Sequence, residues 1–133
     1  MRTRIKIFKN AYSNSEVPEL KIEQRNKKTS PEFQELYNKA GVYLLFTDET
    51  VKKPIYIGRS CSNLARTIAR HFQDWTKAKE LKFVELNPRK LDRYYLEYEL
   101  MPARDEDDED EIINRETALI EEYQPRLDIR KNA

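Results

Sequence analysis

Two short stretches near the middle of the chain place apolar side chains at every second position. These positions are Val42, Leu44 and Phe46 in the first stretch and Ile55 and Ile57 in the second. A period of two is typical of strands, and the polar segment 47–54 between the stretches ends in proline, so the pattern predicts a β-hairpin. If the apolar positions face a core, Tyr43 and Tyr56 project together from the other face. Aromatic packing across the strands or a functional role would explain this pair of phenols.

A helix is expected on each side of the hairpin. Ser30 followed by Pro31 is typical of a helix start, because serine caps the first turn and proline suits its first position. This helix would cover residues 31–40 and end at Gly41. After the hairpin, Ser62 can cap a second helix. The inward positions of that second helix would be Leu64, Ile68, Phe72 and Trp75.

Further strands and a last helix complete the expected order. Alternation over residues 94–100, followed by Pro102, predicts a third strand, and residues 4–8 form a possible short one. Apolar spacing over residues 111–123 predicts the last helix, which Pro125 stops. The pattern therefore predicts an α/β fold with a small central sheet and flanking helices.

The chain of 133 residues is long enough for one domain with a modest core. Its one cysteine excludes an internal disulfide framework, and no Cys/His pattern indicates a zinc site. The N-terminus lacks the apolar segment of a signal peptide, and no run is as long as a membrane span. We therefore expect a cytoplasmic protein that does not bind membranes.

The net charge of +1 conceals an uneven distribution. Residues 1–90 contain 19 Lys and Arg against 10 Asp and Glu, whereas residues 91–133 contain 6 against 14. The larger part of the chain is thus basic, as binding to a phosphate backbone requires. The acidic run 105–111 is expected to form a solvated loop that leads into the last helix. Its alternative role is a DNA-mimicking, autoinhibitory or partner-binding segment.

One carboxylate interrupts the apolar stripe of the last helix. The stripe consists of Ile112, Ile113, Leu119, Ile120 and Tyr123. At about 100° per residue, Glu116 lies near the middle of this stripe. Buried carboxylates are rare unless they are paired, hydrogen-bonded or bound to a metal. Glu116 is therefore either a functional residue or a structural one that bridges to a core tyrosine or arginine.

Three motifs in order resemble the GIY-YIG nuclease superfamily. They are Gly41-Val42-Tyr43, Tyr56-Ile57-Gly58 and, after an Arg-rich helix, the segment from Glu116 to Arg126. The last segment is similar to the end of the UvrC-type nuclease domain, where a catalytic Glu is followed by Leu-Ile and Tyr-x-Pro at the same spacing. The resemblance covers roughly residues 41–128. It implies a GIY-YIG-type domain at 41–133 with a mostly antiparallel three-stranded sheet, preceded by an N-terminal extension at 1–40.

The resemblance also implies a chemistry. It predicts a DNA endonuclease that hydrolyses phosphodiester bonds with one Mg²⁺ or Mn²⁺ ion, for which a single carboxylate, Glu116, suffices. A tyrosine would activate the attacking water, provided that nearby cations favour its phenolate. Tyr43 is the expected general base. Tyr56 would position the water or act as the alternative base.

The catalytic arginine of the superfamily has no direct counterpart, because Thr67 stands at its position. On a helical wheel Arg70 lies nearer to that position than Arg66, so Arg70 is preferred and Arg66 is the second candidate. His71 stands where relatives have Tyr or His, which makes it a further catalytic candidate or a structural histidine. Asp128 replaces an Asn common in UvrC-type domains.

Substrate contacts are expected around the second strand of the hairpin. The candidates are Gly58, Arg59, Ser60, Lys52 and Lys53. Two alternatives to the endonuclease remain open: a catalytically impaired nucleic-acid-binding module of the same fold, and a protein-interaction domain that uses the acidic run. Specificity for DNA would be low, or it would come from residues 1–40, a protein partner or a dimer.

Overall fold

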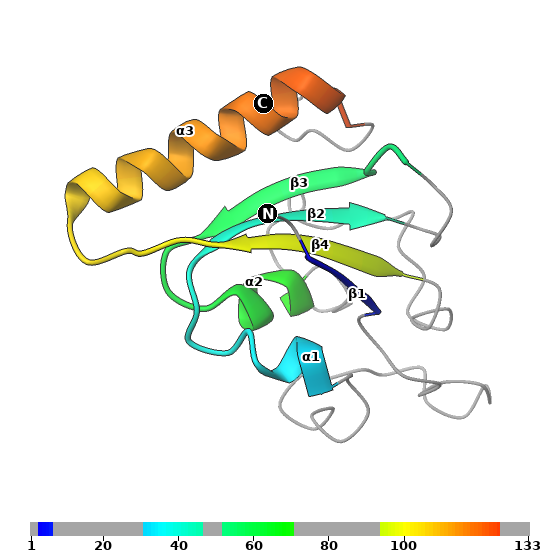
Figure 1. The fold of residues 1–133 in the computed structure, drawn as a ribbon, viewed down its shortest axis with the longest axis horizontal. Helices are drawn as coiled ribbons and strands as arrows, with labels where there is room; N and C mark the ends of the chain where they lie inside the picture. Colours follow the sequence, from blue (N-terminus) through cyan, green and yellow to red (C-terminus); the bar gives the residue numbers. More distant parts are fainter. Residues whose placement is uncertain (1–2, 7–30, 47–51, 71–93, 126–133) are drawn as a thin grey trace.

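The computed structural model describes residues 3–6, 31–46, 52–70 and 94–125. Its elements are β1 (Thr3–Lys6), α1 (Pro31–Gln34), β2 (Gly41–Phe46), β3 (Tyr56–Ser60), α2 (Leu64–Arg70), β4 (Tyr95–Leu100) and α3 (Glu106–Tyr123). The strands form an antiparallel sheet in the order β1-β4-β2-β3, with α3 on one face and α1 and α2 on the other (Figure 1). The predicted α/β class is confirmed, but the sheet has four strands in the described residues instead of three.

The additional strand is β1, which pairs with β4 at one edge of the sheet. The Arg4 guanidinium donates to the Glu97 carboxylate, with Nη2 2.7 Å from Oε2, and stacks over the Phe46 ring at 4.0 Å from its centroid. Part of the expected N-terminal extension therefore belongs to the sheet. The predicted domain boundary before residue 41 stays a prediction.

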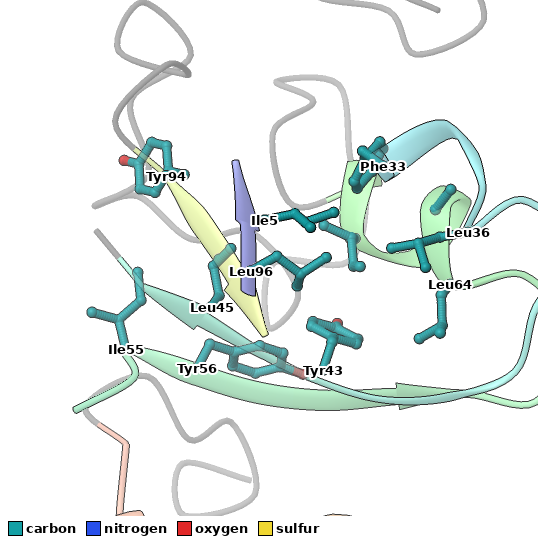
Figure 2. Packing of buried hydrophobic residues seen from close by; sticks show 12 residues of the cluster. Ile5, Phe33, Leu36, Tyr43, Leu45, Ile55, Tyr56, Leu64, Tyr94 and Leu96 are labelled. Atoms are coloured by element: carbon teal, nitrogen blue, oxygen red, sulfur yellow. The ribbon is translucent and has the colours of Figure 1, made fainter. Parts of the chain in front are cut away.

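Both faces of β2 are buried, because helices cover the sheet on both sides. The core on the α1 and α2 side, here called the tyrosine-side core, contains Ile5, Phe33, Leu36, Tyr43, Leu45, Ile55, Tyr56, Leu64, Ala65, Ile68, Tyr94 and Leu96 (Figure 2). The α3-side core contains Val42, Leu44, Phe46, Ile57, Ile112, Leu119 and Ile120. The tyrosine face is thus a second core. Ile55 joins it, contrary to prediction, because Ile55 precedes the first residue of β3 and escapes the strand alternation.

Helix α1 is much shorter than the predicted helix over residues 31–40. Phe33 and Leu36, two apolar residues of the predicted helix, are buried. The helix itself ends at Gln34, and the chain continues in turns. Asn38 adopts a left-handed conformation with φ of 62°. That conformation is incompatible with a continuing right-handed helix, and it explains why the helix does not reach Gly41.

Helix α2 begins close to the expected position but has a different cap. The Asn63 side-chain oxygen accepts from the Arg66 amide at 3.2 Å, as an N-cap does. The amide of Ser62, the predicted cap, donates instead to the Ser60 hydroxyl at 3.3 Å. Phe72 and Trp75 of the predicted apolar stripe lie outside the described residues.

The acidic run forms the first turns of α3 and is no loop. Asp105 is the N-cap, and its Oδ1 accepts from the Asp108 amide at 2.9 Å. Acids in a first turn are favourable because they face the positive end of the helix dipole. The helix ends at Tyr123 as predicted, and Gln124 closes it in a left-handed conformation with its N–H donating to Ile120 O at 2.7 Å. No helix in the described segments is long and apolar enough to cross a membrane.

Gly41 is required where β2 begins. Its φ is 151°, and a side chain there would collide with the backbone carbonyl oxygen of Glu99 on β4. Any residue with a Cβ atom would push the two central strands apart. The first glycine of the GIY motif is thus explained by sheet geometry.

Candidate active site

The two motif tyrosines meet on the tyrosine-side core. In the β2–β3 pairing Tyr43 lies opposite Gly58, and Leu45 lies opposite Tyr56. The tyrosine rings are 6.0 Å apart between centroids and inclined at 45°, side by side on the sheet (Figure 2). The prediction that both phenols share one face is confirmed.

Gly58 provides the space in which the Tyr43 phenol lies. A Cβ atom at position 58 would be 2.5 Å from the Tyr43 hydroxyl oxygen and 2.8 Å from Cε2 of Tyr56. Atoms do not approach so closely without displacement, so glycine is needed here. The missing side chain at Gly58 thus leaves room for the Tyr43 phenol. A contact of Gly58 with substrate stays a prediction.

The Tyr43 phenol is held in its protonated form. Burial raises its pKa well above the ordinary value of 10.0, and the charges of Tyr56 and Glu116 raise the pKa further. A hydrogen bond with Tyr56 also raises the Tyr43 pKa.

Glu116 occupies the centre of the buried stripe of α3, as its sequence position predicts. The buried residues of this helix are Ile112, Glu116, Leu119 and Ile120. The Glu116 carboxylate pairs with Arg59 of β3, with Nη1 2.6 Å from Oε1. The structural alternative left open by the sequence, a bridge to an arginine, is thus observed. A buried carboxylate needs such a partner, because desolvation of an unpaired charge is costly.

A second ion pair fixes the register of α3. Arg115, the neighbour of Glu116, donates from Nε to Oε2 of Glu99 at 2.8 Å and from Nη2 to Oε1 at 2.9 Å. Such a bidentate pair constrains geometry as well as charge. Sequence reasoning missed this pair. The sequence feature that could have indicated this pair is Glu99 on a predicted strand, because an acidic side chain that faces a packed helix requires a cation.

The two halves of the site meet around β3, the edge strand of the sheet. Tyr56 and Gly58 face the tyrosine-side core, while Ile57 and Arg59 face α3. The Tyr43 phenol reaches across Gly58 to this edge, where the charge of Glu116 contributes to its raised pKa. The phenols and the Glu116–Arg59 pair therefore lie on opposite faces of the sheet at one edge strand.

The other predicted site residues that the structure describes lie before β3, at its end and on α2. Lys52, Lys53 and Arg66 are exposed. Ser60 is buried, and its hydroxyl oxygen accepts from the amides of Ser62 and Asn63, which shapes the turn into α2. Arg70 ends α2, but the position of its side chain, like His71 and Asp128, lies outside the described residues.

Glu116 is the predicted metal ligand. Within the described part of the chain no group of three or more His, Cys, Asp or Glu side chains could hold a metal ion. Mg²⁺ and Mn²⁺ do not require such a group, because they keep several waters and use one or two carboxylates. The donor chemistry of Glu116 fits: it is a hard carboxylate oxygen, largely buried, and already paired with a cation.

Comparisons with protein-family models and with curated proteins found no match. Among solved structures, the chain is similar to a point mutant of the GIY-YIG N-terminal endonuclease domain of UvrC from Thermotoga maritima, bound to its catalytic divalent cation. The two sequences are 24% identical, the match covers 82% of this chain and 98% of that chain, and the TM-score is 0.48.

Proposed function

We propose that this protein is a divalent-metal-dependent endonuclease of the GIY-YIG type that hydrolyses DNA phosphodiester bonds. One arrangement supports the proposal above all. The phenols of Tyr43 and Tyr56 lie on one side of the edge strand β3, and the Arg59–Glu116 pair lies on the other. A proton acceptor, an anion-binding cation and a metal-binding carboxylate are the groups that phosphodiester hydrolysis needs.

The burial of Tyr43 favours Tyr56 as the proton acceptor. Tyr43 is buried in the core, and this burial raises its pKa. A phenol whose pKa is raised keeps its proton at neutral pH and is a poor base. We therefore assign the general base to Tyr56 and a positioning role to Tyr43. This is the alternative order of the two roles considered from the sequence.

Glu116 would hold one Mg²⁺ or Mn²⁺ ion. When bound, such an ion neutralises charge at the phosphate and lowers the pKa of a bound water. Arg59, on the same strand as Tyr56, would contact a phosphate oxygen, and the exposed Lys52 and Lys53 precede this strand and would attract the DNA backbone. A protein partner or dimer that supplies specificity stays a prediction.

Cleavage of plasmid DNA with Mg²⁺ or Mn²⁺, with and without EDTA, tests the proposal. Cleavage should require the ion, and Glu116→Gln should abolish cleavage while DNA binding is retained. Glu121→Gln is the matched control, because it makes the same change at an exposed position of the same helix. Cleavage by Glu116→Gln at the wild-type rate would contradict the assignment of the metal to Glu116. Cleavage that persists in EDTA would contradict the requirement for a divalent ion.

The second candidate is a catalytically impaired DNA-binding module of the same fold. The observation that favours it is the Arg59–Glu116 pair, because Arg59 neutralises the buried carboxylate without a metal. Salt-dependent DNA binding without cleavage under any divalent ion would support this second candidate over the first.

A further inference from the structure

The Arg59–Glu116 pair is made through a single pair of atoms, Nη1 and Oε1, at 2.6 Å. The neighbouring pair of Arg115 and Glu99 uses two nitrogens and both carboxylate oxygens. Bidentate guanidinium–carboxylate pairs are stronger and geometrically more specific than single contacts. Arg59 is therefore held less firmly than Arg115, although both lie at the junction of α3 with the sheet.

Burial of the two partners is unequal. The Glu116 side chain is 8% exposed, whereas the Arg59 side chain is 41% exposed. Arg59 can move into solvent without disturbing the core, but Glu116 stays in the α3 stripe between Ile112 and Leu119. A carboxylate left in that position without a cation would be strongly destabilised. Departure of Arg59 is thus favourable when another cation takes its place.

A divalent ion and Arg59 compete for this carboxylate. Mg²⁺ binds carboxylate oxygens at about 2.0–2.1 Å and keeps a shell of waters around it. Nη1 of Arg59 already lies 2.6 Å from Oε1, so two cations on Glu116 would repel each other at close range. The released guanidinium presents a planar set of donors that matches a phosphate.

We propose that Arg59 exchanges between two anions: it holds Glu116 in the free protein and transfers to a substrate phosphodiester when a divalent cation binds the carboxylate. The inference deepens the proposed function and rests on it. Binding of the cation and binding of the phosphodiester then strengthen each other. The cation releases Arg59 from Glu116, and the phosphodiester draws Arg59 away from the carboxylate that the cation needs. Such coupling is reciprocal by thermodynamic necessity.

Titration of Mn²⁺ into the free protein, with unbound Mn²⁺ measured by EPR, tests the competition. Arg59→Gln should bind Mn²⁺ about tenfold more tightly than the wild type, because the competing cation is gone. Arg104→Gln is the matched control: it loses the same charge from an exposed arginine that pairs with Asp108, and its Mn²⁺ affinity should stay within about twofold of wild type. Melting temperatures verify that each variant is folded.

A second arm adds diethyl phosphate, a small soluble phosphodiester. It should tighten Mn²⁺ binding to the wild type several-fold and have no effect on Arg59→Gln, which has no guanidinium to transfer. If Arg59 merely anchors Glu116, Arg59→Gln binds Mn²⁺ more weakly than wild type. That result, an unchanged affinity, or an equal effect of diethyl phosphate on both proteins overturns the inference.

Glu116→Gln separates this inference from the proposed function. If Mn²⁺ binding depends on Glu116 but does not increase in Arg59→Gln, the exchange is wrong and the metal site stands. If Glu116→Gln binds Mn²⁺ as the wild type does, the metal site at Glu116 is wrong, and the exchange is overturned with it.

Discussion

Tyr43 of β2 lies opposite Gly58 of β3, and its phenol fills the space that any side chain at Gly58 would occupy. Gly58→Ala places a methyl group 2.5 Å from the Tyr43 hydroxyl oxygen, so the ring must move. We expect a loss of about 1–3 kcal/mol in the free energy of unfolding, the usual cost of overpacking a core. Urea denaturation measures it.

A double-mutant cycle tests whether the loss of stability in Gly58→Ala comes from the clash with the Tyr43 ring. In a Tyr43→Leu background the clash with the Tyr43 ring is relieved and only the contact with Tyr56 remains, so the additional cost of Gly58→Ala should be smaller than in the wild type. Additive costs would mean that Gly58 is needed for its backbone and not for the phenol.

The order of the two tyrosines can be read from single-turnover cleavage rates. Tyr56→Phe should slow cleavage by about a hundredfold or more, the scale of losing a general base. Tyr43→Phe removes one hydrogen bond with Tyr56, worth about 1 kcal/mol, and should slow cleavage by about tenfold or less. Both variants keep the ring packing, so melting temperatures should change little. The reverse ranking would make Tyr43 the base.

The buried Tyr43 phenol should also make the fold sensitive to alkali. Its pKa is raised by burial above the ordinary 10.0, so above that pH the unfolded chain loses this proton while the folded chain keeps it. The Tyr43 phenol therefore makes its full contribution to the free energy of unfolding below about pH 10. Above that pH the contribution declines, with a limiting slope of about 1.4 kcal/mol per pH unit. The free energy of unfolding, measured from denaturation curves between about pH 8 and about pH 11, should fall more steeply with pH for the wild type than for Tyr43→Phe. Equal slopes would contradict this prediction.

The two candidate arginines of α2 remain to be separated by function. On the helical wheel of the sequence Arg70 is nearer than Arg66 to Thr67, the expected position of a catalytic arginine. Arg70→Ala should therefore lower the single-turnover rate by about a hundredfold, about 3 kcal/mol of transition-state stabilisation. Arg66 is exposed, and Arg66→Ala should mainly weaken DNA binding and reduce its salt dependence by about one charge. A dead Arg66→Ala enzyme would identify Arg66 as the catalytic cation.

Local patterns predicted the strands better than they predicted the helix boundaries. The alternation that located β2, β3 and β4 reflects side chains fixed on two faces by the sheet, and the left-handed Gln124 before Pro125 ends α3 where expected. The extent of α1 depended on the conformation of Asn38, which composition does not determine. The acidic run was expected to form a solvated loop, but it forms the first turns of α3, where its acids lie at the favourable end of the helix dipole.

The sequence predicted which residues belong to the site, but it did not predict which of them pair with each other. The stripe of α3 identified Glu116 as a buried carboxylate, yet the choice of Arg59 as its partner depends on how α3 crosses β3. Likewise, the motif placed both tyrosines on one face, but the raised pKa of Tyr43 follows from its burial in the folded core. Contacts between distant segments require the folded structure.

The pairing of β1 with β4 has a consequence for how the protein is made. Arg4 and Glu97 are 93 positions apart, so the N-terminal strand must wait for most of the chain to be synthesised before it finds its neighbour. Contacts of such long separation slow folding. Until β1 docks, β4 presents a bare strand edge that other chains can join, so trimming even the first few residues would favour aggregation of the newly made protein.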